Sequence, residues 1–357
     1  MKHIPQLDGI RCVAILCVIV GHWIAWDVQN VFVRNIPWSH GVLLFFVLSG
    51  YLISNILLSL KEKTEKEEIT IKKALFTFYV RRFLRIFPIY YLTIFFLCYI
   101  NFKDARELFP WLVTYTSNLL QASKGTLLGD FTHFWSLAVE EQFYLFWPFF
   151  ILLVKRKHLL KGIYITIGLS LLSRILCVLL YPELWTMGAY FSLNLALPLA
   201  LGALIAWYQR YNQPVFQKIF CSHLFFYLSG TVYLAFLILK KYIPMPFVDM
   251  VFDQYFFSVF AMFFVTLAAT SRFRFAGKWF LEHKVVVYLG TISYGLYVYH
   301  LFIGPLYFDW LSAELALHTE SKYTLWGLYF IILILLSSLS YYLIEFPVNA
   351  LKKYFSY

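Results

Sequence analysis

The sequence has few charged residues for its length. Of its 357 residues only 14% are Asp, Glu, Lys or Arg, whereas 61% are hydrophobic and 21% are aromatic. Soluble domains carry roughly 25% charged residues, and no soluble fold can hide so much apolar side-chain surface from water. This scarcity of charge excludes a soluble enzyme, a nucleic-acid-binding protein and a disordered scaffold. The chain is predicted to be a polytopic membrane protein.

The sequence also lacks any paired cysteine pattern. Its five cysteines are odd in number and none of them forms a CxxC pair. A disulfide framework and a zinc site both need regular cysteine spacing, so neither is expected, and no metal is predicted. The net charge of +11 does not require a nucleic-acid partner, because the cytoplasmic loops of membrane proteins collect Lys and Arg.

Long hydrophobic runs dominate what is present. A membrane-spanning helix needs about 20 apolar residues, and by that measure we predict an all-α bundle of about ten spans. They fall near residues 10–26, 41–60, 83–100, 134–154, 159–180, 190–208, 223–239, 252–270, 285–304 and 324–344. The run 190–208 contains Pro198, and residues 108–121 are expected to form a partly buried interfacial helix.

Basic residues orient these spans. If the N-terminus is cytoplasmic, the inner segments hold 21 Lys and Arg residues and the outer segments hold seven. Because basic residues accumulate on the cytoplasmic side, both termini are predicted to be cytoplasmic. The segment Lys61–Lys73 then lies inside the cell, and its mixed charges suit a solvated helix.

Ionisable residues within spans are costly and mark candidate sites. Arg11 and His22 lie eleven residues apart in the first span, which puts them about 20° apart around a helix and about 16 Å apart along it. Arg11 at the inner rim is suited to a phosphate, and His22 deep in the span is suited to act as a base. The alternative is a snorkelling arginine and a histidine hydrogen-bonded in the core.

Two further spans carry polar groups. Arg82 and Arg85, spaced i,i+3, form a two-pronged anion clamp or else anchor the helix to lipid headgroups. In the fourth span a polar stripe is expected at helical spacing, formed by His133, Ser136, Glu140 and Tyr144, with Glu141 to one side. Ser293, Tyr297 and His300 form a weaker stripe. Ser49 and Gly50, in contrast, favour close helix packing.

Five motifs occur along the chain in a fixed order: LDGIRCVAILCVIVGH, LFFVLSGYLIS, RRFLRIFPIYY, HFWSLAVEEQFYLFWP and ISYGLYVYHLF. Together they resemble the landmarks of the membrane-bound acyltransferase family 3, the bacterial O-acetylases of O-antigen, exopolysaccharide and related glycans. A closing IEFP lies at 344–347. The resemblance implies one integral-membrane acyltransferase domain over residues 1–357, without a fused soluble domain. One departure is Leu43, where the family usually has an acidic residue.

The resemblance also implies a site and a reaction. Its Arg-x10-His element falls on Arg11 and His22, its Arg-x-x-Arg element on Arg82 and Arg85, and its VEEQFY segment on Glu140 and Glu141. The three arginines would bind the phosphates of cytoplasmic acetyl-CoA. His22 would be a general base oriented by Glu140 or Glu141, or would itself carry the acetyl group, and direct transfer is slightly favoured.

The acceptor implied by the resemblance is a hydroxyl of a cell-surface glycan or lipid-linked sugar. The candidates for binding it are His133, Ser136, Tyr297 and His300. The expected protein is thus a multi-pass O-acetyltransferase of the bacterial inner membrane, with the lipid bilayer and no nucleic acid as partner. The alternative is a secondary transporter, which would usually show two similar halves with broken helices; the sequence shows no such repeat.

Overall fold

The computed structural model describes residues 3–24, 36–306 and 322–355. Within these ranges the chain forms helices and no strand. The α-helices are α1 (Pro5–Trp23), α3 (Gly41–Glu65), α4 (Ile71–Tyr99), α5 (Ala105–Val113), α6 (Ser117–Lys124), α7 (Phe134–Leu153), α8 (Arg156–Leu180), α9 (Trp185–Tyr190), α10 (Ala196–Tyr211), α11 (Gln213–Val215), α12 (His223–Tyr242), α13 (Pro246–Ala269), α14 (Phe275–Leu281), α15 (Lys284–Thr291), α16 (Ser293–Leu306), α18 (Lys322–Ser340) and α19 (Phe346–Ala350). Short 3-10 or π segments join several of them, at Trp38–His40, Gly129–Phe131, Ser192–Leu195, Phe216–Phe220, Tyr341–Glu345 and Leu351–Tyr354.

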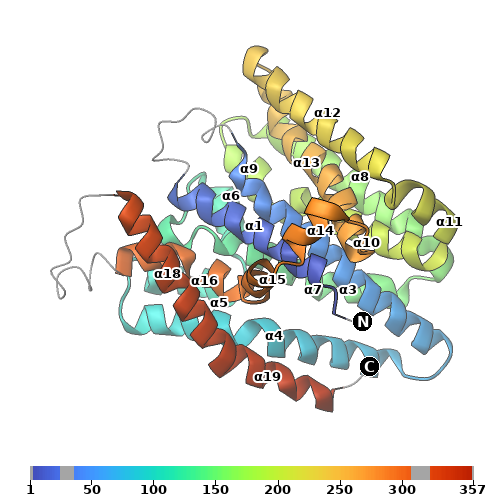
Figure 1. The fold of residues 1–357 in the computed structure, drawn as a ribbon, viewed down its shortest axis with the longest axis horizontal. Coiled ribbons are helices and arrows are strands. Elements are labelled where there is room, and N and C mark those ends of the chain that lie inside the picture. The colour runs from blue at the N-terminus through green and yellow to red at the C-terminus, as the bar shows by residue number, and fades with distance from the viewer. Residues whose placement is uncertain (1–2, 25–35, 307–321, 356–357) are drawn as a thin grey trace.

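The helices form a bundle around α1 and α3. Figure 1 shows α8, α12 and α13 on one side of this central pair and α4 and α18 on the other. In the described residues, nine helices are long and apolar enough to cross a membrane, or ten if the bent pair α15 and α16 is one span. This confirms the predicted all-α, polytopic architecture. Residues 25 and 26 of the first predicted span lie outside the described residues.

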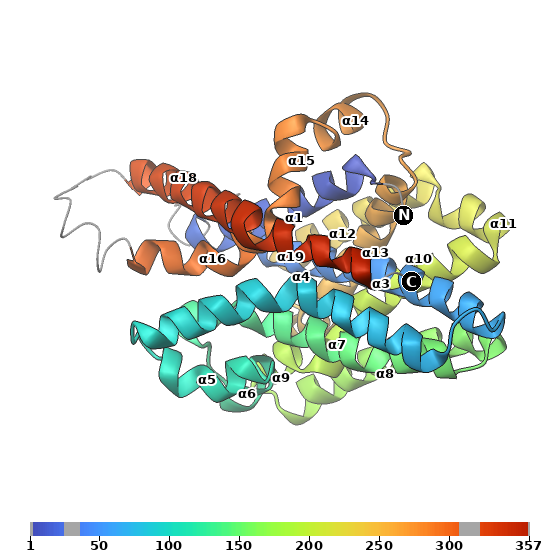
Figure 2. The ribbon, with the colours of Figure 1, turned by 90° about the horizontal axis from the view of Figure 1, so that it is seen from below.

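The chain begins and ends on the same side of the bundle. The two chain ends lie close together in both views (Figures 1 and 2), and the Arg81 guanidinium donates to the carbonyls of Lys352 and Phe355, both at 2.9 Å. An even number of spans requires this arrangement. The cytoplasmic location of that side remains a prediction from the basic residues.

Glycine makes the central helices pack closely. A Cβ added to Gly50 of α3 would lie 2.0 Å from the carbonyl oxygen of Leu199 in α10, and one added to Gly202 would lie 2.1 Å from that of Val47. Only glycine fits where two backbones approach so closely. The same holds where α1 crosses α15, since a Cβ on Gly290 would lie 1.9 Å from the Asp8 carbonyl oxygen. The packing role expected for Gly50 is therefore what the structure shows.

The helix boundaries depart from the hydropathy pattern in three places. The segment Lys61–Lys73 is not one solvated helix, because α3 ends at Glu65 and α4 begins at Ile71. The interfacial run 108–121 is divided between α5 and α6. The ninth predicted span bends by 72° between α15 and α16. Pro198 is compatible with α10 because it lies in the first turn, where a backbone N–H has no helical partner.

Candidate functional site

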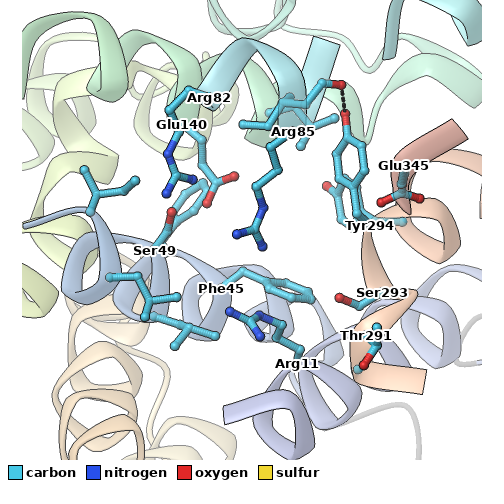
Figure 3. A pocket seen from close by; sticks show the side chains of 18 of the residues that line it. Arg11, Phe45, Ser49, Arg82, Arg85, Glu140, Thr291, Ser293, Tyr294 and Glu345 are labelled. Carbon is cyan, nitrogen blue, oxygen red and sulfur yellow. Dashed lines mark hydrogen bonds between the residues drawn. The ribbon is translucent and has the colours of Figure 1, made fainter. Parts of the chain in front are cut away.

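A pocket of about 500 Å³ opens into the bundle between α1, α3, α4, α7 and the bent pair α15 and α16. Its lining is rich in charged and hydroxyl side chains (Figure 3). These are His3, Asp8, Arg11, Ser49, Arg82, Arg85, Ser136, Glu140, Glu141, Tyr144, Thr291, Ser293, Tyr294, Tyr297, Tyr341, Glu345 and Lys352, and Asn349 adds an amide. Such a concentration of ionisable groups within a membrane bundle marks a functional site.

Three guanidinium groups enter the pocket. Arg11 comes from α1, and Arg82 and Arg85 come from α4 on the facing side (Figure 3). Arg11 is paired with Asp8 one turn earlier, and the Arg82 guanidinium lies 5.4 Å from the ring centre of Tyr144. Arg85 is exposed to the pocket and has no hydrogen bond or ion pair within the described residues. The two arginines of the predicted clamp thus face a cavity. To bind an anion there, Arg85 would not have to break a hydrogen bond or ion pair within the described residues.

Carboxylates share the same pocket. Glu140 lies beside Ser49 and near Arg82 (Figure 3), and Ser49 is hydrogen-bonded to the Tyr144 hydroxyl. Within the described residues, one carboxylate oxygen of Glu141 and one of Glu345 are buried without a hydrogen-bond partner. Buried polar atoms are normally paired, so these oxygens indicate that the pocket is built for a polar occupant or water.

The polar stripe predicted on α7 is present. Ser136, Glu140 and Tyr144 all line the pocket, as does the flanking Glu141. His133, one turn before Ser136, lies beyond the end of the pocket. The stripe therefore runs along the pocket wall and continues beyond the pocket.

Past that end lies a cluster of three histidines. The Nε2 atom of His300 lies 2.9 Å from Nδ1 of His22, and the His133 ring centre lies 4.9 Å from that of His300. His133 and His300 are buried, with 1% and 0% exposure, whereas His22 is exposed. None of the three lines the pocket. Among residues 3–24, 36–306 and 322–355, no group of three or more His, Cys, Asp or Glu side chains has the arrangement of a metal site.

Tyr297 separates the pocket from the histidines. Its hydroxyl is hydrogen-bonded to Ser136 Oγ at 2.5 Å and donates to the His133 carbonyl oxygen at 2.7 Å. Its ring centre lies 5.6 Å from those of both His133 and His300. Since Ser136 and Tyr297 also line the pocket, they form its inner wall and the near side of the histidine cluster.

The structure therefore divides the candidate residues into two groups. Arg11, Arg82, Arg85, Glu140 and Glu141 share the pocket, and His22 shares a cluster with His133 and His300. In the described part of the chain no hydrogen bond or ion pair joins either glutamate to His22. The hydrogen-bond neighbour of the His22 imidazole here is His300, and the orienting role expected of Glu140 or Glu141 stays a prediction.

Sequence reasoning overlooked other pocket residues. Tyr294 lies off the predicted 293–297–300 stripe, yet it lines the pocket and its hydroxyl donates to the Ile86 carbonyl oxygen at 2.7 Å (Figure 3). Lys352 was counted only as a cytoplasmic cation, and Ser49 was assigned to packing. The available signal for Lys352 was that it is the first basic residue after the last predicted span, whereas Tyr294 had no such signal because it lies off the polar stripe.

The fold and site define a multi-pass membrane protein whose bundle contains a polar pocket lined by three arginines. A family model described as an acyltransferase domain, acyltransferase family 3, matches residues 4–345. The chain belongs to this family, as its motifs predicted. Membership favours acyl transfer over the transporter alternative, and with the spanning helices it supports the predicted location in a bacterial cell membrane.

The curated relatives of this chain are named as O-acetyltransferases, in agreement with the family match. Peptidoglycan O-acetyltransferase OatA of Listeria monocytogenes is 29% identical over 325 residues, covering 84% of this chain and 49% of the relative. A Staphylococcus aureus protein provisionally named as an O-acetyltransferase is 28% identical over 341 residues, covering 87% and 52%. The chain thus spans about half the length of the curated relatives that it matches. No solved structure matches it.

Proposed function

We propose that the protein is a membrane O-acetyltransferase that moves an acetyl group from cytoplasmic acetyl-CoA to a hydroxyl of a cell-surface glycan. The observation that carries this proposal is the convergence of Arg11, Arg82 and Arg85 on one pocket inside a bundle of the acyltransferase family. The name of the Listeria relative favours peptidoglycan, or a precursor of it, as the acceptor.

The pocket suits the anionic end of a CoA thioester. Arginine binds phosphate through charge-assisted, two-pronged hydrogen bonds, and the arginines approach the cavity from opposite sides (Figure 3). A volume of about 500 Å³ falls within the range of small-molecule sites. Glu140 and Glu141 lie close enough to Arg82 to interact with its charge, and would offset part of it in addition to the orienting role predicted for one of them.

His22 would supply the base. In direct transfer, His22 takes the proton of the acceptor hydroxyl while its oxygen attacks the thioester carbonyl carbon. The C–S bond breaks, and the proton passes from His22 to the departing CoA thiolate. Transfer through an acetyl-histidine would use the same imidazole as nucleophile. Direct transfer remains the slightly favoured route, because it needs no second covalent step.

The wall between pocket and histidines is where the two substrates would meet. The thioester arm has to pass Ser136 and Tyr297, whose hydroxyls hold each other and the His133 backbone. These hydroxyls can hydrogen-bond the thioester carbonyl or the acceptor sugar once their mutual bonds open. This assigns Ser136, Tyr297, His133 and His300 to the surroundings of the reacting atoms.

The decisive test uses purified protein in nanodiscs with acetyl-CoA labelled in the acetyl group. We expect CoA release that depends on added muropeptide acceptor, and a mass increase of one acetyl group on that acceptor. In parallel, mass spectrometry compares the surface glycans of cells with and without the protein. Tight CoA binding without acetylation of any surface glycan would contradict the proposal, as would acetylation that persists without a CoA thioester.

A further inference from the structure

The hydrogen bonds of His300 determine which nitrogen of His22 carries a proton. Nδ1 of His300 lies 2.6 Å from the backbone carbonyl oxygen of Tyr297, and its Nε2 lies 2.9 Å from Nδ1 of His22. A carbonyl oxygen only accepts hydrogen bonds, so Nδ1 of His300 must be the protonated nitrogen. A neutral imidazole has one N–H, which leaves Nε2 of His300 as an acceptor.

The consequence for His22 follows directly. Its Nδ1 must donate to Nε2 of His300, so in the neutral ring the proton is on Nδ1 and the lone pair is on Nε2. The His22 ring also interacts with the backbone carbonyl of Val18, one helical turn earlier on α1, and the His22 side chain is exposed. With the Nδ1 proton directed at His300, the lone pair that a second molecule could use is on Nε2.

The backbone of His300 is hydrogen-bonded to α1 at the residue next to His22. The indole of Trp23, next to His22, donates to the His300 carbonyl oxygen at 2.9 Å. The 72° bend before Ser293 sets the direction of α16, and His300 itself is fully buried. Two bonds between adjacent residues thus fix His22 against His300, and rotation of either ring would break at least one of them.

We propose that His300 is a positioning residue that holds His22 in the Nδ1–H tautomer and so presents Nε2 as the reacting nitrogen. The proposal rests on the proposed role of His22 and deepens it. Tautomer control of a catalytic histidine by a partner on its other nitrogen is a general device. Here the partner is a neutral imidazole anchored on a carbonyl, and not a carboxylate.

The arrangement also allows His22 to take up and release the proton of the acceptor hydroxyl during transfer. When His22 takes the acceptor proton on Nε2, its ring becomes a cation with N–H on both nitrogens. Nδ1–H still donates to His300, whose own Nδ1–H still donates to Tyr297. Neither of these two hydrogen bonds has to exchange its donor and acceptor. The proton on Nε2 can then pass to the thiolate.

Two substitutions at one position separate tautomer control from packing. In His300→Gln the side-chain carbonyl can accept from Nδ1 of His22, whereas His300→Leu fills the space without an acceptor. We expect His300→Leu to lower kcat at least tenfold with an unchanged KM for the donor, and His300→Gln to restore most of that loss. The control is Tyr299→Phe, which removes a hydroxyl of the adjacent residue that is hydrogen-bonded to Ser340 at 2.9 Å and to Thr93, and which should leave kcat unchanged. Equal losses in His300→Leu and His300→Gln would overturn the proposal.

A measurement on the resting protein is independent of turnover. With 15N-labelled histidine, the ring nitrogens of His22, identified by their loss in His22→Gln, should report protonated Nδ1 and unprotonated Nε2. In His300→Leu we expect a shift toward protonated Nε2. If the wild-type His22 ring already has its proton on Nε2, the tautomer proposal is wrong even when acetyl transfer is confirmed. If the tautomer is as proposed but His22→Gln retains full turnover, the proposed role of His22 fails instead.

Discussion

Arg85 offers the sharpest test of the donor pocket. It projects into the cavity (Figure 3) and has no hydrogen bond or ion pair within the described residues, so Arg85→Ala breaks none of these bonds in the free protein. If Arg85 binds a CoA phosphate, the lost charge-assisted hydrogen bond should weaken binding by about 1.5–3 kcal/mol, or roughly 10- to 150-fold in Kd. Folding stability should change by no more than about 0.5 kcal/mol, as for other exposed positions.

Comparison with Arg82 adds a structural contrast. Its guanidinium packs on the rings of Tyr144 and Phe78, at 5.4 and 5.9 Å from their centres. Arg82→Ala should therefore weaken CoA binding and also lower the melting temperature, whereas Arg85→Ala should affect binding alone.

The assay is isothermal titration with desulfo-CoA, which binds but cannot carry an acyl group, together with thermal unfolding of each variant. Lys278→Ala is a matched control, because Lys278 is an exposed cation on α14 outside the pocket. Unchanged CoA affinity in Arg85→Ala would show that α4 uses its arginines to anchor the helix in lipid, and would refute the donor assignment.

Three other predictions test the remaining steps. His22→Gln should reduce acetyl transfer by about 10²–10⁴-fold, the usual cost of losing a general base, with desulfo-CoA binding intact; near wild-type turnover would remove His22 from the mechanism. Gly50→Ala should destabilise the protein by about 1–3 kcal/mol in thermal unfolding, because the added Cβ would clash with the backbone of α10. Gly168→Ala is the control and should not destabilise the protein, because a Cβ there has no neighbouring atom within 4 Å. On a cysteine-free background, a membrane-impermeant reagent should label intact cells through a cysteine at Lys103 and not through one at Glu65; the reverse pattern would invert the topology.

Hydropathy predicted where the membrane-spanning segments lie, but not where their helices begin and bend. The third span was expected over 83–100, yet α4 begins at Ile71, because the rise of hydropathy marks where lipid begins and not where backbone hydrogen bonding begins. Residues such as Lys72 and Lys73 extend the helix into water. The bend at Ile292 had no local signal such as an internal proline. It accompanies the close crossing of Gly290 over α1, which is a tertiary contact.

Helical spacing predicted which side chains share a face of a helix, but not which of them lie in the same part of the site. Arg11 and His22 do lie on one helix, and the family resemblance implied that both act on acetyl-CoA. The structure places Arg11 in the pocket and His22 beyond its wall. That wall comes from Ser136 and Tyr297 on two other helices, so no periodicity within the first span could reveal it.

The closed wall at Tyr297 has a consequence for the cell as well as for catalysis. An enzyme that draws its donor from one aqueous compartment and delivers to another has to avoid becoming a leak. Each proton crossing a membrane at 100 mV dissipates about 2.3 kcal/mol, and an open water column would conduct far faster than any acetyl group is transferred. Because the Tyr297 hydroxyl is bound to both Ser136 and the His133 carbonyl, we expect this wall to limit proton flow between the pocket and the histidine cluster in the resting protein.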